Sequence, residues 1–279
     1  MKSPIISIDD FKALQSDPNL VVFDARVGAD AEERFVKQHI QGARFLDLDR
    51  DLAEVPVDAS IGGRHPLPTL ETFQETLENS GANDESIFVV YDDKSGANAG
   101  ARLWWMLKAF GFDEVSILDG GFQAAEANGI TMESGKPEVE KGKLSNRKEW
   151  ILPMSLISEV ENGIKENSAT IIDVRDAYRY RGESEPIDLI AGHIPGAINI
   201  PFSKNLQSDG RFLSAEELKS KYYELLKDKS KKLIIQCGSG VTACHTILAL
   251  TAAGFEIPNL YVGSWSEWSR TDRPIAKEV

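Results

Sequence analysis

Short apolar runs rich in β-branched residues alternate along the chain with longer helical patterns. The run IFVVYD (87–92) is typical of a buried strand, and a turn of small residues leads from it into the apolar helical pattern ARLWWMLKAFG (101–111). The same order recurs with LIIQC (233–237) and VTACHTILALTAAG (241–254). Strands that alternate with helices predict an α/β fold in which the strands pair in parallel through right-handed crossovers.

The ends of these elements carry further signals. Both helical patterns stop at a glycine, Gly111 and Gly254, the residue that most often caps a helix at its carboxyl end. In parallel sheets, ligands bind at the carboxyl ends of the strands. Asp92 and Cys237 both fall at that place, so we expect the chemistry of the chain there.

The two halves of the chain repeat one pattern. The matching segments are LVVFDAR (20–26) and TIIDVRD (170–176), HIQGARFLDL (39–48) and HIPGAINIPF (193–202), and SIFVVYD (86–92) and KLIIQC (232–237). We therefore predict two tandem domains of one kind, at 1–130 and 151–279, each a parallel sheet flanked by helices. The polar and charged stretch between them, 131–150, is the predicted linker.

Composition excludes several classes of partner. The 279 residues carry a formal net charge of −13, which disfavours nucleic acids and anionic membranes as partners. No stretch approaches the roughly 18 unbroken apolar residues of a membrane span. The first residues, MKSPIISIDDF, lack the basic and apolar regions of a signal peptide, so we expect a cytoplasmic protein.

The chain has two cysteines, Cys237 and Cys244, and their spacing cannot build a disulfide framework. Cys237 opens the loop CGSGVTA between a strand and a helix. Small residues let successive backbone N–H groups point at one spot, and the helix N-terminus adds partial positive charge, so the loop favours an ionised, nucleophilic thiol. The alternative is a buried structural cysteine, but such a residue has no need of Gly-Ser-Gly beside it.

Two chemistries use a cysteine placed in this way. Cysteine-dependent phosphatases bind phosphate with loop amides and with the arginine of a Cys-x5-Arg signature. Here Ala243 stands six residues after Cys237, so the bidentate clamp on a phosphoryl group is missing. Sulfur transfer needs a smaller cradle, for one sulfur atom on the cysteine.

The loop CGSGVTA, the paired FDAR/IDVR and HIxGA segments, the WWML helix and LDGGF against VGSWSEW together resemble the two-domain sulfurtransferases of the rhodanese superfamily. The resemblance covers nearly the whole chain. Within the superfamily the loop is similar to that of 3-mercaptopyruvate sulfurtransferases, because thiosulfate-preferring members carry charged residues at the positions of Gly238 and Ser239. The resemblance implies a catalytic second domain only, and Asp92, which replaces the cysteine in the first domain, agrees with this.

The resemblance also implies roles for single residues. Ser239, His65 and Asp49 match a proton relay that would serve Cys237; the alternative for His65 is an exposed loop histidine. Arg179 matches a substrate-binding arginine, with Arg181 as a nearby substitute, and the alternative for both is a solvated surface charge. The predicted substrate-binding loop residues are Gly238, Gly240, Val241 and Thr242.

One position departs from the family pattern. A second arginine is expected after the Glu185-Pro186 pair, and Ile187 stands there. We expect Arg181 or Arg64 to take its place in part.

Several conspicuous residues are predicted to be structural. His39 and His193 occur in the same HIxGA context in both halves, including the half without a cysteine, which favours a role in the fold. Cys244 is predicted to be a small core residue. We expect the aromatic pair Trp104-Trp105 to pack in the core. Trp265 and Trp268 are also expected in the core, and the alternative is that they line the site or the seam between the domains.

The resemblance thus predicts a sulfurtransferase that moves sulfur from 3-mercaptopyruvate through a Cys237 persulfide to a thiol or cyanide acceptor. The alternatives are a thiosulfate:cyanide sulfurtransferase and a non-catalytic sulfur carrier for a protein partner. No metal or organic cofactor is expected, since no cluster with ligand spacing is present in the sequence. The expected partners are the small-molecule donor and acceptor, and a protein acceptor remains an option.

Overall fold

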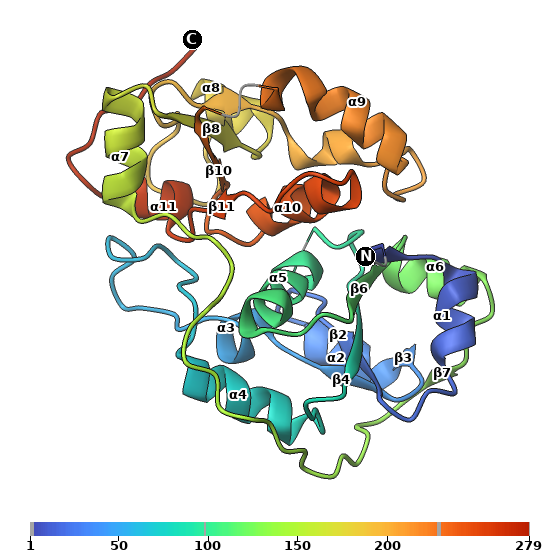
Figure 1. Cartoon of the computed structure of the whole chain (residues 1–279). Helices are drawn as coiled ribbons and strands as arrows, with labels where there is room; N and C mark the ends of the chain where they lie inside the picture. Colours follow the sequence, from blue (N-terminus) through green and yellow to red (C-terminus); the bar gives the residue numbers. More distant parts are fainter. Residues whose placement is uncertain (1–2, 98, 228–229, 279) are drawn as a thin grey trace. The chain divides into compact units, whose positions relative to one another are not determined.

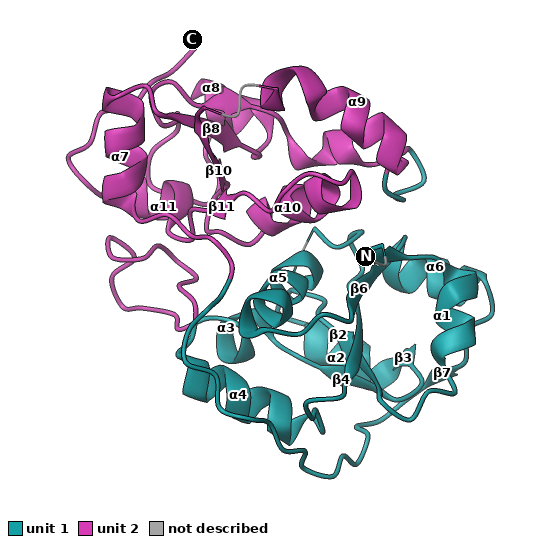
Figure 2. Cartoon of the chain, viewed as in Figure 1, with its two compact units in different colours: residues 1–53, 68–151, 208–212 teal, residues 54–67, 152–207, 213–279 magenta. Residues whose placement is uncertain are grey.

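The computed structural model describes residues 3–97, 99–227 and 230–278. The chain forms two compact units, which Figure 2 shows in teal and magenta. Unit 1 comprises residues 1–53, 68–151 and 208–212, and unit 2 comprises residues 54–67, 152–207 and 213–279. Neither unit is continuous in sequence, which differs from the contiguous domains expected from the repeat.

Unit 1 is built on a five-stranded parallel sheet in the order β1-β6-β5-β2-β4. Its strands are β1 (Ile5–Ile6), β2 (Leu20–Asp24), β4 (Ala43–Phe45), β5 (Ile87–Tyr91) and β6 (Val115–Leu118), and a separate antiparallel pair is formed by β3 (His39–Ile40) and β7 (Met132–Glu133). The central strands β2 and β5 are almost wholly buried. This is why their sequences are apolar runs and not alternating patterns.

Helices cover both faces of this sheet (Figure 1). They are α1 (Ile8–Leu14), α2 (Ala31–Lys37), α3 (Leu48–Asp51), α4 (Leu70–Asn79), α5 (Gly100–Phe110) and α6 (Gly121–Ala127). Phe11 of α1, Phe35 of α2 and Ala125 of α6 share one core cluster with Val22 and Val89 of the sheet. On the other face, aromatic rings join α4, α5 and the sheet, because Phe73 packs on Phe110, Phe110 on Phe112, and Phe112 on Phe88.

Unit 2 repeats the arrangement on a four-stranded parallel sheet in the order β11-β10-β8-β9. Its strands are β8 (Ala169–Asp173), β9 (Ile198–Asn199), β10 (Lys232–Gln236) and β11 (Asn259–Leu260). The register of β8 on β10 pairs Asp173 with Gln236, and in unit 1 β2 on β5 pairs Asp24 with Tyr91. The residue that follows the central strand is Cys237 in unit 2 and Asp92 in unit 1.

The helices of unit 2 also form two layers (Figure 1). They are α7 (Ile157–Lys165), α8 (Ala177–Arg181), the 3-10 helix η1 (Phe202–Asn205), α9 (Ala215–Leu226), α10 (Ala243–Ala252) and α11 (Ser264–Trp268). Val160 of α7, Tyr180 of α8 and Trp265 of α11 share a core cluster with Ile171 and Ile234 of the sheet. The helices α9 and α10 pack together, and α10 contacts β10 and β11.

The structure confirms the main elements expected from the sequence. The strands β5 and β10 end one residue before Asp92 and Cys237. Gly111 caps α5 in the left-handed region at φ +110°, and Gly254 follows α10 at φ +82°, where a side chain would be strained. Both sheets are parallel, with helices on either face.

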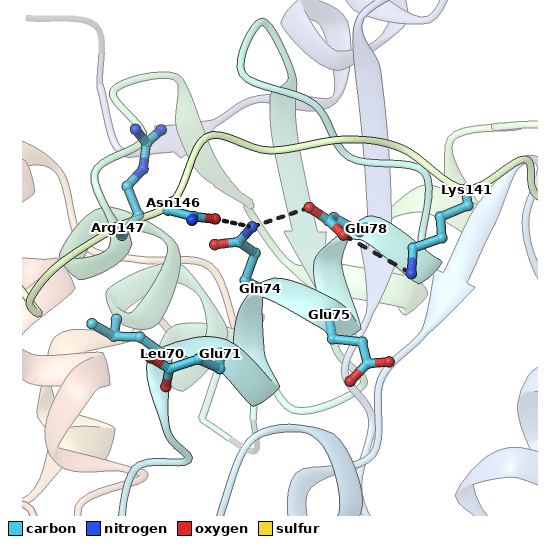
Figure 3. A pocket seen from close by; sticks show the side chains of 8 residues that line it. All are labelled: Leu70, Glu71, Gln74, Glu75, Glu78, Lys141, Asn146 and Arg147. Carbon is cyan, nitrogen blue, oxygen red and sulfur yellow. Dashed lines mark hydrogen bonds and ion pairs between the residues drawn. The ribbon is translucent and has the colours of Figure 1, made fainter.

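The predicted linker, 131–150, is bound to α4 by hydrogen bonds. The carboxylate of Glu78 accepts hydrogen bonds from the backbone N–H of Leu144 and the side chain of Gln74, both at 3.1 Å. Figure 3 shows Gln74 and Glu78 on α4, with Asn146 and Lys141 reaching them from the linker. These contacts explain why the linker belongs to unit 1 as far as Ile151.

Candidate active site

The candidate nucleophile lies at the carboxyl end of a central strand. Cys237 directly follows β10, and the loop it opens ends at Thr242, the residue before α10. Cys237 is 3% exposed. The position is the one where α/β sheets bind ligands, because the loops there diverge and helix N-termini point at the same space.

The backbone of this loop is fixed by the turn that opens α11. The N–H of Cys237 donates to Ser264 Oγ at 3.1 Å, and the Cys237 carbonyl accepts from Trp265 N at 3.1 Å. The Gly238 carbonyl accepts from Ser266 N at 2.8 Å. Gly240 has φ +72°, and a Cβ there would lie 2.5 Å from the carbonyl oxygen of Val262. Glycine is therefore required at this point of the loop by both conformation and space.

The matching loop of unit 1 holds an anion. The Asp92 carboxylate is fully buried and accepts hydrogen bonds from the backbone N–H groups of Lys94, Gly96 and Gly100, at 2.8, 2.8 and 3.1 Å. Burial raises the pKa of Asp92 to about 6, and the backbone donors lower it only in part. The strand–loop–helix unit thus offers convergent N–H donors. In unit 1 these N–H groups bind the carboxylate of Asp92.

Ser239 and His65 meet beside Cys237. Ser239 is 5% exposed, and its Oγ lies 2.7 Å from Nδ1 of His65. His65 is contributed by the segment 54–67, which belongs to unit 2. The expected pair is therefore in hydrogen-bond contact, and the role of His65 in a proton relay stays a prediction.

The segment 54–67 is anchored on α11. The N–H of Gly62 donates to Glu267 Oε1 at 2.9 Å, and the N–H of Arg64 donates to Ser266 Oγ at 3.0 Å. A Cβ on Gly63 would lie 2.3 Å from the carbonyl oxygen of Gly263, so the two backbones are in close contact. These contacts hold Arg64 and His65 next to the loop that Cys237 opens.

Arginines gather around Asp188, close to Gly238 of the loop. Arg179 is 8% exposed, and its Nη2 lies 2.7 Å from Glu185 and 3.3 Å from Asp188. Burial by itself lowers the pKa of Arg179, but the hydrogen bond to Glu185 and the negative charges of Glu185 and Asp188 outweigh it, and the net pKa is raised. Arg179 is thus buried and held by two carboxylates, and its role in substrate binding stays a prediction.

Two further arginines share Asp188 with Arg179. Arg64 Nε lies 3.0 Å from Asp188 Oδ1, and Arg270 Nη1 lies 3.3 Å from the same oxygen. A Cβ placed on Gly238 would meet Arg64 Nη2 at 3.1 Å and Arg179 Nη2 at 3.5 Å. Two guanidinium groups therefore border the Cys237 loop at Gly238, and any side chain at Gly238 would crowd them.

Two further residues of the expected site are Arg181 and Asp49. Arg181 is 41% exposed at its side chain and pairs with Glu183, so the surface-charge alternative describes it better than the role of a substitute for Arg179. Asp49 is an exposed residue of α3 in unit 1, where its N–H is bound to Asp47. Its part in a relay with His65 stays a prediction.

The residues expected to be structural are buried and bonded in the fold. His39 Nδ1 lies 2.8 Å from the carbonyl of Phe35, and His193 Nδ1 lies 2.8 Å from the carbonyl of Tyr180. Cys244 is fully buried, and its thiol donates to the Gly240 carbonyl at 3.3 Å, one turn below the catalytic loop. The predictions of a structural role for these residues are confirmed. The same holds for the tryptophans, which are all at most 1% exposed: Trp104, Trp105, Trp265 and Trp268.

Sequence reasoning missed several residues of the site, namely Asp188, Arg270, Ser264, Ser266 and Glu267. The position of one of them, Ser264, could have been recognised from the repeat. Gly121 in LDGGF matches Ser264 in VGSWS, and both have a positive φ, of +58° and +52°. A serine at a position that favours glycine indicates that its hydroxyl is needed, and here it binds the N–H of Cys237.

Over the described ranges 3–97, 99–227 and 230–278, no group of three or more His, Cys, Asp or Glu side chains is placed to hold a metal ion. Within the same ranges, no helix has the length and apolar character needed to cross a membrane.

Comparison with known proteins gives consistent matches along both halves. The family model described as rhodanese-like domain matches residues 7–128 and 156–271. A probable 3-mercaptopyruvate sulfurtransferase from Pseudomonas aeruginosa is 40% identical over 280 residues, which cover 98% of this chain and 97% of that protein. A putative thiosulfate sulfurtransferase from Mycobacterium tuberculosis is 34% identical over 249 residues, which cover 89% of this chain and 86% of that protein.

A solved structure is similar over nearly the whole chain. The crystal structure of SseA from Escherichia coli, described as a 3-mercaptopyruvate sulfotransferase, superposes with a TM-score of 0.80 at 31% identity, over 95% of this chain and 100% of that one.

Proposed function

Because the chain belongs to the rhodanese superfamily and is a sulfurtransferase with two rhodanese-like domains, we propose that it takes sulfur from 3-mercaptopyruvate and passes it through a persulfide on Cys237. The observation that carries this proposal is the position of two guanidinium groups, those of Arg64 and Arg179, beside Gly238, the residue after Cys237. A thiolate would attack sulfur, while a planar cation binds the carboxylate at the far end of a small keto acid.

The first half-reaction forms the persulfide. The Cys237 thiolate attacks the sulfur of 3-mercaptopyruvate, an S–S bond forms, and the C–S bond breaks with its electron pair on carbon. The resulting pyruvate enolate takes up the proton of the donor thiol at carbon and leaves as pyruvate. The products are pyruvate and a Cys237 persulfide anion, which suits a loop of convergent N–H donors like the one that holds Asp92 in unit 1.

The second half-reaction transfers the outer sulfur of the persulfide to the acceptor. A thiolate or cyanide attacks the outer sulfur, the S–S bond breaks, and the Cys237 thiolate is restored. The acceptor leaves as a persulfide or as thiocyanate. A protein thiol can accept the sulfur by the same chemistry.

The pair Ser239–His65 would carry the proton between the donor thiol and the enolate carbon. The hydroxyl of Ser239 both accepts and donates hydrogen bonds, and the imidazole of His65, 2.7 Å away, can hold the proton in transit. Asp49 would orient His65.

A second donor is thiosulfate. A cluster of cations beside Gly238 would also attract that dianion, and the Mycobacterium tuberculosis relative is named as a putative thiosulfate sulfurtransferase. Against it, Gly238 and Ser239 add no charge of their own to the loop.

The test is a comparison of kcat/KM for the two donors with cyanide as acceptor. We expect the larger value for 3-mercaptopyruvate. A larger value for thiosulfate would make the alternative function the right one, and no turnover with either donor would favour a non-catalytic sulfur carrier.

A further inference from the structure

A buried hydrogen-bond network in unit 2 ends at a lysine amine. Asn205 of η1 is fully buried, and its Oδ1 accepts from the hydroxyl of Tyr222 at 2.6 Å and from Nζ of Lys221 at 2.7 Å. The Nδ2 of Asn205 donates to Oγ1 of Thr246 on α10 at 3.2 Å. Lys221, on α9, is itself only partly buried. Its amine is therefore bound to an uncharged amide oxygen at the border of the protein interior.

The charges near Lys221 oppose its protonation. Burial lowers the pKa of Lys221 most, the positive charge of Lys204 on η1 lowers it further, and the pKa falls to about 8. Across the described residues, no carboxylate forms an ion pair with Lys221. The two acidic side chains one turn away on α9 are bound elsewhere, because Glu217 is bonded at the start of the helix and Glu224 pairs with Lys227.

The titratable residue of α10 at this level is His245, which lies next to Thr246 in the chain. Its ring packs edge-on against Phe202 of η1, with 5.4 Å between the ring centroids. The contact of Lys221 with these two elements is thus made through the neutral amide of Asn205, and the charge that acts on its amine is the like charge of Lys204.

A lysine amine is a nucleophile only in its neutral form. At pH 7.5, about a quarter of side chains with a pKa of about 8 are neutral, against about one in a thousand at the ordinary value near 10.4. The lower basicity makes each neutral amine less reactive, but by a smaller factor. Because Lys221 is only partly buried, a small electrophile has access to it.

We propose that Lys221 is a site of acylation by acyl phosphates, a class of small activated acyl donors. The neutral amine attacks the carbonyl carbon, and a C–N bond forms. The C–O bond to phosphate breaks with its electron pair on the phosphate oxygen, which takes up the proton that the nitrogen loses. Lys204, the cation that faces this amine, attracts the anionic phosphate of the donor. The products are an uncharged amide on Lys221 and inorganic phosphate.

The test is acetylation of the intact protein by acetyl phosphate, with the rate at each lysine followed by peptide mass spectrometry over a range of pH. Lys219, which is exposed on the same helix, is the matched control in every sample. We expect the rate at Lys221 to level off above a midpoint at about pH 8, whereas the rate at Lys219 should keep rising toward about pH 10. At pH 7.5, Lys221 should react about tenfold faster than Lys219.

Two variants should move the midpoint in a known direction. Asn205→Asp places a carboxylate at the amine, so the midpoint for Lys221 should rise by about one pH unit or more, and acetylation at pH 7.5 should slow about tenfold. Lys204→Gln removes the facing charge and should raise the midpoint by a smaller amount. Lys204→Arg keeps that charge and should match the wild type. Lys204 is exposed, so its variants test the inference even where Asn205→Asp fails to fold.

A midpoint for Lys221 equal to that for Lys219 would overturn the inference. The same conclusion would follow if Lys221 stayed unmodified while Lys219 was acetylated. Neither result bears on the proposed function, because sulfur transfer from 3-mercaptopyruvate is measured separately and on Cys237.

Discussion

Nδ1 of His65 lies 2.7 Å from Oγ of Ser239, two residues after Cys237, although 174 positions separate the two residues in sequence. The contact depends on the anchoring of the segment 54–67 by Glu267 and Ser266. His65, which lies outside the repeated segments, is thereby held next to Ser239 of the loop that Cys237 opens.

A comparison of 3-mercaptopyruvate with thiosulfate as donor tests whether Ser239 and His65 transfer a proton. His65→Gln should lower kcat for 3-mercaptopyruvate about a hundredfold, since a proton must reach the enolate carbon and a positioned acid–base group is worth about that much. Thiosulfate releases sulfite without any proton transfer to carbon, so its kcat should change little. Stopped-flow or steady-state assays with both donors measure this, and equal losses for the two donors would exclude a relay.

Ser264 binds the backbone of the candidate nucleophile, Cys237. At φ +52° it sits in the left-handed region, its hydroxyl accepts from Cys237 N at 3.1 Å and donates to the Tyr261 carbonyl at 2.8 Å. Ser264→Gly relieves the backbone strain but loses the bond, so we expect the free energy of unfolding to change by about 1 kcal/mol or less while kcat/KM falls severalfold.

Ser264→Ala keeps the strain and loses the bond, and should cost about 2 kcal/mol. Urea unfolding of both variants, with kinetics on the same samples, checks the pair. Full activity in Ser264→Gly would show that the Cys237 N–H needs no such anchor.

The sequence predicted the sheet well because its signals are local. The runs that became β5 and β10 are apolar on both faces, and Gly111 and Gly254 mark the helix ends. The repeat then placed Asp92 and Cys237 at matching positions. Each of these features depends on residues close together in the chain.

The arginine cluster could not be predicted in this way. Asp188 binds Arg64 across 124 positions and Arg270 across 82, and no periodic pattern encodes such contacts. Arg179 and Arg181 look alike in YRYRG, but only Arg179 is buried against Glu185, whereas Arg181 lies on the surface. The assignment of 54–67 to unit 2 rests on long-range contacts of the same kind.

A cation can be added where the family pattern has one. Ile187→Arg should lower KM for 3-mercaptopyruvate severalfold, because the exposed residue next to Asp188 would bring a further guanidinium to the cluster, and KM for thiosulfate should change little. Arg179→Ala should raise KM for 3-mercaptopyruvate. Leu189→Arg, at a neighbouring position that is 71% exposed, is the matched control for charge. The same improvement in Leu189→Arg would point to long-range attraction and not to a contact.

The buried carboxylate of unit 1 should show in the pH dependence of stability. Burial raises the pKa of Asp92 to about 6, above the value near 3.9 in an unfolded chain, so the folded state binds the proton more tightly between those pH values. The free energy of unfolding contributed by Asp92 is therefore full below about pH 4 and is lost as pH rises to about 6, by up to about 3 kcal/mol.

Asp92→Asn should flatten this part of the profile, whereas Asp113→Asn, whose side chain is fully exposed, should not. Urea unfolding between about pH 4 and 7 gives the slopes. An unchanged slope in Asp92→Asn would mean that Asp92 does not titrate in this range.

The most direct test of the account is the location of the transferred sulfur. The protein is incubated with 3-mercaptopyruvate and no acceptor, its intact mass is measured, and the modified peptide is mapped, with Cys237→Ser and Cys244→Ser treated alike. We expect one added sulfur atom on Cys237 and one pyruvate released per chain, no addition and no turnover in Cys237→Ser, and most of the activity in Cys244→Ser. Sulfur found on Cys244, or full activity in Cys237→Ser, would contradict the account.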